Sequence, residues 1–564
     1  MSGHPLKNIK IKFKVQECSD HSFTIAAESL DSADHYWVIQ LHHRILALIP
    51  QVFLNSHPAY ENLMVSYNPV NLPSSEGRRI IEEVISALGS SEAASAENSS
   101  ASEALKSPEK APIKIIPVIY GGVYGPDLPD LSKSLDKSEA EIIGLHTRPT
   151  YEVAFLGFAP GFPYLKGLDV GLHCPRKATP RLKVAAGSVG LAGSQTGIYP
   201  QESPGGWQLI GRTPIKLFDP AAAEPSFLQP GDRLLFQASQ NLNFEESRSG
   251  KSEEIDSSKD KSIDLSKDLS LATLEILSPG FLSSVQDFGR PGFAHLGVSA
   301  GGAADSFALQ EGNRLLGNSE NAAAIEMTAT GATFRFLKPS WGCLTGSSSS
   351  PRQNGHEISM WTTYSFNAGD TLQIGNIEQG LRSYLCLQGG IDVPYVLGSR
   401  STFLAAGWGG LYGRALQTGD LLLVDAPIAT KGFQRSPLKI RDAYSLPVAE
   451  LSVTRGPQWH WFTEDSQQNI ARFEFEVSTE CNRLGLRLMA PPFARLKEFQ
   501  NKELPTEGVA NGSLQITPSG QVMILFCEQQ TTGGYPKMAC IRFSELSKIG
   551  QLRPGQKLRF HVVA

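Results

Sequence analysis

The side chains best suited to chemistry in this sequence are arginines and carboxylates set among glycine and proline turns. Pro175-Arg176 and Pro180-Arg181 place two guanidinium groups beside rigid prolines. A guanidinium carries paired N–H donors that match a carboxylate or a phosphate. The spacing favours an anion-binding loop, and the alternative is a pair of surface arginines that neutralise nearby acids.

A polar, glycine-rich stretch runs from Gln195 to Trp207, after the shorter glycine loop 187–190. Glycine lets backbone N–H groups approach an anion closely. Glu202 adds a carboxylate that could hold Mg²⁺. The alternative is a long surface loop with ordinary turn glycines. The binding candidates in this stretch are Gln195, Tyr199, Ser203, Gly205, Gly206 and Trp207.

The segment from Gly206 to Thr213 looks at first like a phosphate-binding P-loop. Arg212 stands where that motif requires lysine, and Pro214 leads into a strand-like run. A P-loop needs the N-terminus of a following helix to hold its phosphates. We therefore reject a P-loop here.

The second half of the chain supplies carboxylates. Asp287, Asp305 and Glu326 are candidates for a catalytic base or a metal ligand, and Arg290 for holding an anion. Each has a structural alternative, such as Asp305 as a helix cap. The further binding candidates in this half are Arg400, Arg483, Thr531, Thr532 and Tyr535.

Composition indicates that these side chains are positioned by short strands. The chain has 564 residues, enough for three or four domains, and is rich in Gly and Pro. We expect an N-terminal α/β lobe over 1–88, a low-complexity loop over 89–110, a barrel or sandwich over 111–240, a linker over 241–270 and a second β-rich block over 271–564.

Individual elements follow from the same patterns. Strands are predicted at Ile113–Ile119, Glu152–Phe158, Ile215–Phe218 and Arg233–Phe236. A helix is predicted over Ser306–Leu316.

The two large blocks also end alike. Leu228-Gln-Pro-Gly-Asp-Arg-Leu-Leu-Phe236 and Leu552-Arg-Pro-Gly-Gln-Lys-Leu-Arg-Phe560 share a Pro-Gly turn that leads into a strand. Two related barrels in tandem would produce this echo.

Charge and cysteine usage exclude some functions. The formal net charge is -5, which argues against a nucleic-acid partner. Seven cysteines are spread singly, as expected of reduced thiols rather than a disulfide framework. No segment is long and apolar enough to suggest a membrane partner. We expect a cytoplasmic protein.

With these motifs in hand, the chain resembles the family formed by the B and C subunits of 5-oxoprolinase, also described as allophanate hydrolase subunits 1 and 2. The first block carries Gly157-Phe-Ala-Pro-Gly-Phe, both Pro-Arg pairs and Ser203-Pro-Gly-Gly-Trp. The second carries Val285-Gln-Asp-Phe-Gly-Arg, Gly389-Gly-Ile-Asp, Gly398-Ser-Arg-Ser-Thr and Gln530-Thr-Thr-Gly-Gly-Tyr. Asn482 departs from the family pattern, where an aspartate is expected.

The resemblance implies a mostly β protein with α+β parts: two cyclophilin-like β-barrels in tandem, one in 111–240 and one in 271–564, plus the N-terminal α/β lobe. It implies ATP and Mg²⁺ as cofactors and, as partner, a protein like the separate A subunit of 5-oxoprolinase. The activity implied is phosphorylation of 5-oxoproline, a small cyclic amide, for ring opening to L-glutamate. A homo-oligomer is also compatible with it.

Such a reaction would use Arg176, Arg181, Arg290, Arg400 and Arg483 for phosphates and the substrate carboxylate, and Asp287, Asp305 and Glu326 for Mg²⁺. We expect the site in a cleft between the two barrels. The alternatives are a carboxyltransferase-type component of a urea or allophanate pathway and a kinase-binding regulatory protein, since one founding family member was described as a histidine-kinase inhibitor.

Overall fold

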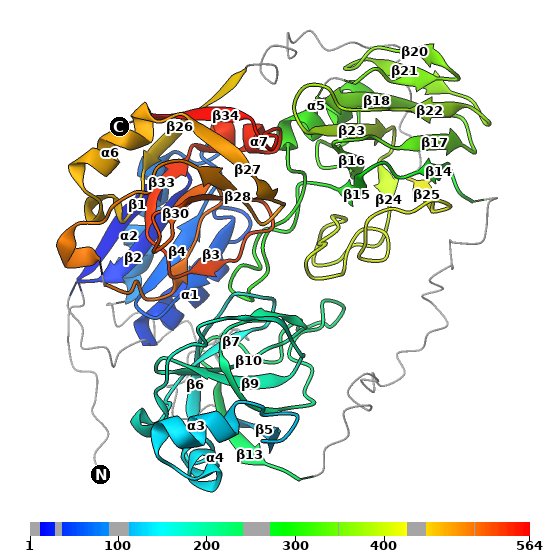
Figure 1. Cartoon of the computed structure of the whole chain (residues 1–564). Coiled ribbons are helices and arrows are strands. Elements are labelled where there is room, and N and C mark those ends of the chain that lie inside the picture. Colours follow the sequence, from blue (N-terminus) through cyan, green and yellow to red (C-terminus); the bar gives the residue numbers. More distant parts are fainter. Residues whose placement is uncertain are drawn as a thin grey trace.

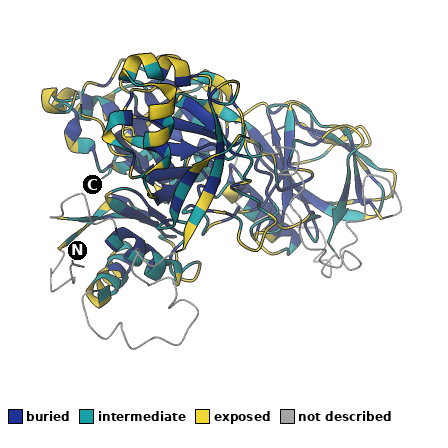
Figure 2. Cartoon of the chain, turned by 90° about the horizontal axis from the view of Figure 1, so that it is seen from below, coloured by how far each residue is buried: buried dark blue, intermediate teal, exposed yellow. Residues whose placement is uncertain are grey.

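The computed structural model describes residues 12–28, 36–88, 112–240, 271–347, 349–425, 447–500 and 502–563. The predicted low-complexity loop 89–110 and linker 241–270 lie outside the described residues. Strands predominate, and most of the core residues lie on them (Figure 2). No helix in the described ranges combines the length and apolar character needed to span a bilayer.

The N-terminal lobe is a four-stranded antiparallel sheet with two helices. Its strand order is β1-β2-β4-β3. Helix α1 packs on the sheet because Trp37, Leu41 and Ile45 recur on one face and are buried. The elements are β1 (Phe13–Ser19), β2 (Ser22–Ala27), α1 (Tyr36–Leu46), β3 (Asn55–Pro58), β4 (Asn62–Ser66) and α2 (Ser74–Leu88).

Residues 112–240 form a closed seven-stranded barrel in the order β10-β7-β6-β13-β5-β12-β9. Closure leaves no strand edge exposed. The strands are β5 (Ile113–Tyr120), β6 (Tyr151–Leu156), β7 (Pro163–Lys166), β9 (Ser188–Ala192), β10 (Gln195–Ile198), β12 (Gln208–Arg212) and β13 (Arg233–Ala238). A separate ribbon pairs β8 (Arg181–Val184) with β11 (Ser203–Gly205), and helices α3 (Leu128–Leu135) and α4 (Glu139–Thr147) lie outside the barrel.

One strand predicted for this barrel was wrong. Residues 215–218 make only an isolated bridge, between Phe218 and Ser226. The backbone N–H of Phe227 donates to Leu217, so the run folds back on the segment that follows it. The seven strands already close the barrel, which leaves no ladder for this run to join.

Residues 271–425 form two packed sheets around one core. One sheet has the order β20-β19-β22-β17-β14-β25-β24 and the other β15-β16-β23-β18-β21. Their strands are β14 (Leu274–Ser278), β15 (Leu282–Gln286), β16 (Ala324–Thr328), β17 (Thr333–Phe336), β18 (Ser340–Gly346), β19 (Arg352–Gln353), β20 (His356–Glu357), β21 (Thr363–Phe366), β22 (Thr371–Gln373), β23 (Arg382–Leu387), β24 (Ile391–Asp392) and β25 (Leu421–Val424).

The predicted helix of this unit is confirmed as α5 (Ser306–Leu316). The Asp305 carboxylate accepts from the backbone N–H of Ala308 at 3.0 Å, as an N-cap does. Gly317 ends the helix with a positive φ of 72°, a conformation that glycine adopts without strain.

Residues 447–563 form a second closed barrel, in the order β26-β33-β30-β31-β28-β27-β34. We call it the C-terminal barrel. The expected single block 271–564 thus contains two units, of which only the last is a closed barrel. Its strands are β26 (Val448–Arg455), β27 (Phe475–Cys481), β28 (Gly485–Met489), β30 (Ser513–Ile516), β31 (Val522–Leu525), β33 (Lys537–Ile541) and β34 (Lys557–Val562).

The sequence echo corresponds to a shared way of closing the two barrels. In the first barrel the last strand, β13, pairs in parallel with the first, β5. In the C-terminal barrel the last strand, β34, pairs in parallel with the first, β26. Each Pro-Gly turn lies just before this closing strand. The prediction of two barrels in tandem is confirmed.

The N-terminal lobe packs against the C-terminal barrel, far away in sequence, as Figure 1 shows by the blue and orange-red elements lying together. The His21 ring Nε2 lies 3.1 Å from the carbonyl oxygen of Asn511. The Asn62 side chain donates to the Glu507 carboxylate at 3.0 Å. Through these contacts the N-terminal lobe lies beside the C-terminal barrel, which in turn lies next to the first barrel.

Candidate functional site

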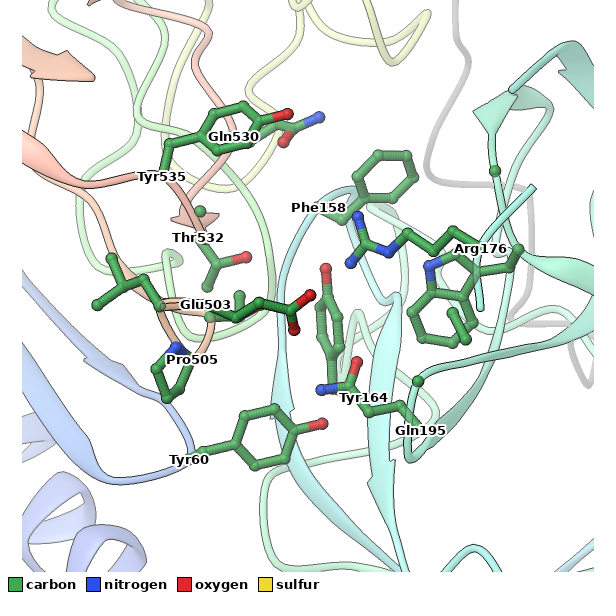
Figure 3. A pocket seen from close by; sticks show the side chains of 18 of the residues that line it. Tyr60, Phe158, Tyr164, Arg176, Gln195, Glu503, Pro505, Gln530, Thr532 and Tyr535 are labelled. Atoms are coloured by element: carbon green, nitrogen blue, oxygen red, sulfur yellow. The ribbon is translucent and has the colours of Figure 1, made fainter. Parts of the chain in front are cut away.

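A pocket of about 1760 Å³ lies between the first barrel and the C-terminal barrel. Residues of the N-terminal lobe, among them Tyr60 and Glu61, complete its wall. Figure 3 shows four side chains from the two barrels directed toward its centre: Tyr164, Arg176, Glu503 and Thr532. The expected cleft between two barrels is therefore present.

The first barrel supplies an aromatic wall. Phe162 meets Tyr164, Tyr199 and Trp207 with ring centroids 5.1, 5.2 and 5.5 Å apart, in tilted and edge-on arrangements. Burial raises the pKa of Tyr164 to about 12, against the opposing effect of the Arg176 charge. Its hydroxyl therefore stays protonated at neutral pH and can donate a hydrogen bond to a ligand.

The loop that carries Arg176 is held on both sides. The carbonyl of Pro175 accepts from the Gln208 side chain at 3.1 Å, and the backbone N–H of Lys177 donates to Gly206 at 2.8 Å. The buried Asp127 carboxylate accepts from Lys177 Nζ at 2.8 Å. No hydrogen bond or ion pair connects the Arg176 guanidinium to any residue that the structure describes, so its donors are available to a ligand.

The C-terminal barrel contributes Thr532, which begins the short strand β32 (Thr532–Gly533). It touches the first barrel directly: a Cβ placed on Gly157 would lie 2.3 Å from Thr532 Oγ1. The preceding residue, Thr531, is 3.1 Å from the ring Nε2 of His57 in the N-terminal lobe. The N-terminal lobe, the first barrel and the C-terminal barrel therefore meet at this threonine pair.

The pocket is positively charged although the chain is acidic. Six cationic side chains line the pocket, against three carboxylates. A surplus of positive charge inside a concave surface concentrates anions there. The cations are Lys166, Arg176, Lys177, Arg487, Arg495 and Lys502, and the carboxylates are Glu61, Glu480 and Glu503.

Eight of the residues predicted from the sequence as candidates line this pocket, contributed by both barrels. They are Arg176, Gln195, Tyr199, Gly205, Gly206, Trp207, Thr532 and Tyr535. Gly205 lies so close to Tyr199 that an added Cβ would be 2.3 Å from the phenol oxygen, so this glycine makes room for the aromatic ring.

Two predicted binding residues of the first barrel lie outside the pocket lining. Arg181 donates to the Asp127 carboxylate at 2.6 Å, so it anchors the Arg176 loop and does not face a ligand. Ser203 lies in the ribbon strand β11, and its hydroxyl is buried without a hydrogen-bond partner in the described residues. Thr531 likewise faces His57 and not the pocket.

Asp287, Arg290 and Arg400 belong to an internal network of the 271–425 unit. The Asp287 carboxylate accepts from the hydroxyls of Ser399 and Ser401 and from the backbone of Arg400 at 2.6 Å. Arg290 donates to Ser401 and lies over the Trp408 ring, 4.7 Å from its centroid. Arg400 pairs with Asp392 and Asp425. These groups hold the 395–413 loop in place.

Asp305, Glu326 and Arg483 lie where the 271–425 unit meets the C-terminal barrel. The Glu326 carboxylate accepts from Arg483 at 2.6 Å and from the Tyr384 hydroxyl at 2.7 Å. Asp305 caps α5 and accepts from the Gln551 side chain at 2.7 Å. All three residues are buried and lie outside the pocket. Their hydrogen-bonding groups are engaged by other residues of the protein, which leaves none of them to bind a ligand.

The expected carboxylate site for Mg²⁺ is not formed by these residues. Asp287 is bound by the 399–401 loop, whereas Glu326 and Asp305 serve the junction with the C-terminal barrel. Within the described ranges, no three His, Cys, Asp or Glu side chains gather closely enough to hold a metal ion.

Sequence reasoning missed several pocket residues. Tyr60 was not singled out as a binding residue, and Glu503 and Lys502 stand in a charged stretch that resembles a solvated surface. Tyr164 belongs to the aromatic, turn-rich run 157–165, which the sequence indicates is either a rigid pocket-lining loop or a structural turn, and this run does line the pocket. The others reach the pocket through contacts between distant segments.

Comparison with known proteins agrees with this architecture. Residues 13–228 match the model described as carboxyltransferase domain, subdomain C and D, and residues 296–562 match carboxyltransferase domain, subdomain A and B. The crystal structure of the protein TTHA0988 superposes with a TM-score of 0.79 at 27% identity, covering 96% of this chain and 99% of that one.

Relatives match each half separately. The chain is 37% identical to the C subunit of 5-oxoprolinase from Escherichia coli strain K12 over 290 residues, 51% of this chain and 90% of that protein. It is 56% identical to the B subunit of 5-oxoprolinase from Escherichia coli O157:H7 over 135 residues, 24% of this chain and 61% of that protein.

A larger protein contains a related part. The chain is 31% identical to urea amidolyase of Saccharomyces cerevisiae over 301 residues, 51% of this chain and only 16% of that protein. Taken together, the two carboxyltransferase-domain matches and the separate matches to two subunits show that the chain belongs to the carboxyltransferase-domain family of the 5-oxoprolinase B and C subunits, with both parts fused in one polypeptide.

Proposed function

We propose that the chain is the fused B–C component of an ATP-dependent 5-oxoprolinase and acts with a separate A subunit. The observation that carries this proposal is the pocket between the two barrels, in which Arg176 and Glu503 face the centre without an ion pair to a described residue (Figure 3). The names of the relatives of both halves support the same substrate.

5-Oxoproline fits the groups in this pocket. It is a flat five-membered lactam with one carboxylate, which the Arg176 guanidinium can bind through two parallel hydrogen bonds. The hydroxyls of Tyr164 and Thr532 can donate to the lactam oxygen, and Glu503 can accept from the lactam N–H. The aromatic wall gives the ring an apolar surface and excludes water.

The chemistry needed is activation of a stable amide. The lactam oxygen attacks the γ-phosphorus of ATP, a new O–P bond forms, and the bond to the bridging oxygen breaks as ADP leaves with the electron pair. Glu503 takes the lactam N–H proton, which leaves an imidoyl phosphate whose ring nitrogen is uncharged. Cationic side chains that are already in place around the transferring phosphoryl group lower the barrier, since they need no reorganisation.

Two water molecules complete the overall reaction. The first adds to the activated ring carbon, and the carbon–nitrogen bond breaks to give an acyl phosphate with a free amine. The second releases inorganic phosphate and leaves L-glutamate. We assign these later steps to the separate A subunit. Because the reaction consumes ATP, we also propose that the protein acts in the cytoplasm.

The residues fit ATP as a substrate better than they fit a protein-held metal. The pocket is large and cationic, as a polyphosphate requires. It offers no cluster of three metal-ligating side chains among the described residues. Mg²⁺ commonly keeps its waters and binds through the nucleotide phosphates, where it neutralises charge, and this pocket leaves room for that mode.

The test is product analysis with the purified chain and its cognate A subunit. We expect glutamate and phosphate in equal amounts when both proteins, ATP and 5-oxoproline are all present. Omission of any one component should abolish both products. ATP-independent ring opening, or no products from two folded proteins, would refute the proposal.

A second function is favoured by the family matches. Both matching models describe carboxyltransferase domains, and urea amidolyase contains a related part. The same pocket could then accept urea or a related amide and a carboxyl group carried by biotin on another protein. Carboxylation of urea that depends on an added biotin carrier, with no activity on 5-oxoproline, would establish this alternative.

A further inference from the structure

The cations of the pocket differ in whether a carboxylate neutralises them. Lys177 pairs with Asp127 at 2.8 Å, and Arg487 pairs with Glu480. Lys166 is attracted by Glu152 and Glu61. No described carboxylate pairs with the other three, which are Arg176 on the first barrel and Arg495 and Lys502 on the C-terminal barrel.

Arg495 and Lys502 belong to one patch, because Leu496, Phe499 and Lys502 all contact the same aromatic residue, Trp461. The backbone N–H of Leu496 donates to the carbonyl of Trp461 at 2.9 Å. Trp461 stacks on Phe499 with ring centroids 5.0 Å apart and planes 3° apart. The Lys502 ammonium lies 5.2 Å from the centroid of the Trp461 ring.

The charge of this patch is available to a ligand. Partial burial lowers the pKa of Arg495, and no acid opposes the shift. Among the residues that the structure describes, its guanidinium donates only to the carbonyl of Ile516, at 3.5 Å, and it remains charged at neutral pH. Lys502 is exposed and contacts aromatic faces, which attract its charge without neutralising it.

We propose that Arg495 and Lys502 form a phosphate subsite that holds the polyphosphate of the nucleotide, on the wall opposite Arg176. The proposal rests on the proposed function for its nucleotide, but its residues are not used by the lactam. Glu503 follows Lys502 directly and faces the pocket centre (Figure 3). The phosphoryl donor and the lactam thus enter from different barrels and meet beside Glu503 and Thr532.

The test is calorimetric titration of the full chain with two probes, inorganic tripolyphosphate and 5-oxoproline. The double variant Arg495→Gln/Lys502→Gln should weaken tripolyphosphate binding at least about 10-fold and leave 5-oxoproline binding unchanged, since two charged contacts are lost. Arg176→Gln should show the opposite pattern. Lys497→Gln is the matched control, because this lysine is exposed in the same segment but does not line the pocket.

The outcomes separate the two proposals. Loss of tripolyphosphate binding in the double variant supports the phosphate subsite. If the wild-type chain also does not bind 5-oxoproline, the oxoprolinase function is refuted while the phosphate subsite stands. Wild-type tripolyphosphate affinity in the double variant, an equal loss in Lys497→Gln, or no binding to the wild-type chain would overturn the subsite. Unchanged thermal unfolding midpoints are expected for all three variants.

Discussion

Two junctions in this molecule are built from the same types of residue and serve different purposes. The pocket lies between the first barrel and the C-terminal barrel. The second junction, which we call the ionic junction, joins the 271–425 unit to the C-terminal barrel through Asp305, Glu326, Arg382, Arg483 and Glu528. In the ionic junction the carboxylates are bound by buried arginines and amides. In the pocket, Arg176 and Glu503 have no such partner among the described residues.

This difference separates a structural contact from a binding site. A buried charge that is fully paired has no capacity left for a ligand, and it fixes how two units fit together. A charge that faces a cavity without a protein partner is stabilised by water, or by a ligand that carries the opposite charge. Variants in the ionic junction should therefore change stability, and variants in the pocket should change binding.

The largest effect is expected from Arg483→Gln. This change leaves Glu326 and Glu528 buried without their common partner, which costs about 3–5 kcal/mol of unfolding free energy. Urea unfolding measures the loss. Arg559→Gln, which removes an exposed ion pair with Glu474, should cost less than about 1 kcal/mol. Equal losses in the two variants would contradict the comparison.

The same junction makes stability depend on pH. Burial by itself would raise the pKa of Glu326, but the charges of Arg483 and Arg382 hold it below its ordinary value of 4.5. A carboxyl whose pKa is lower in the folded state stabilises the protein above pH 4.5, and this stabilisation is lost as the pH falls through the folded value. Arg483→Gln should flatten that acid limb in unfolding experiments between pH 7 and pH 3.

In the pocket, Arg176→Gln should weaken 5-oxoproline binding about 10–100-fold, because it removes a charged hydrogen-bonding partner. Calorimetry against 5-oxoproline and against 2-pyrrolidinone, which lacks the carboxylate, measures the loss of discrimination. Arg148→Gln is the control, since Arg148 belongs to the same barrel and pairs with Asp169. A loss of stability with unchanged affinity would place Arg176 with the structural arginines.

Gly157→Ala tests the contact between the barrels directly. The new methyl group would lie 2.3 Å from Thr532 Oγ1, so the barrels must shift, at a cost of about 1–3 kcal/mol. The second change Thr532→Ala removes the two closest atoms and should restore most of the stability. Thermal unfolding of the two single variants and the double variant measures this coupling. Strictly additive losses would mean that the residues do not touch.

The smallest effect is expected from Asp127→Asn. Burial opposes ionisation of this carboxyl, but donors from Arg181, Lys177 and the backbone of Leu209 lower its pKa from 3.8. The amide keeps the shape and loses the charge that anchors the Arg176 loop, so 5-oxoproline affinity should fall about 3-fold, less than one charged hydrogen bond is worth. Asp219→Asn, at an exposed pair with Lys216, should leave the affinity unchanged.

Local sequence patterns predicted much of the fold. Short apolar runs between glycine and proline turns identified three of the seven strands of the first barrel, namely β5, β6 and β13. The glycine-rich segments 187–190 and 195–207 were taken as loops although they overlap β9, β10 and β11, and the run 215–218 folds back instead of joining a ladder. The repeated Pro-Gly ending marked the closing strand of both barrels. The caps at Asp305 and Gly317 marked α5, because helix ends depend on residues within one turn.

The candidate site was predicted less completely. The glycine and aromatic segments of the first barrel were recognised, because their composition departs from that of an ordinary strand. The carboxylates at 287, 305 and 326 were assigned to catalysis because the sequence does not show which charges already have partners. Glu503 and Lys502 were missed for the same reason, since a charged stretch in sequence looks the same on an open surface and on a pocket wall.

Local sequence patterns identified the Pro-Gly turns before the closing strands, the ends of α5 and the chemical character of the first barrel's loops, because these features depend on neighbours within a few residues. Closure of each barrel is a tertiary event, since it pairs the first strand with the last. The tertiary structure alone decided which arginine is free and which is bound. Arg176 and Arg181 stand five residues apart in matching Pro-Arg pairs, yet Asp127 binds the second and leaves the first to the pocket. That choice depends on a carboxylate about fifty residues away in the chain, brought near only by closure of the barrel.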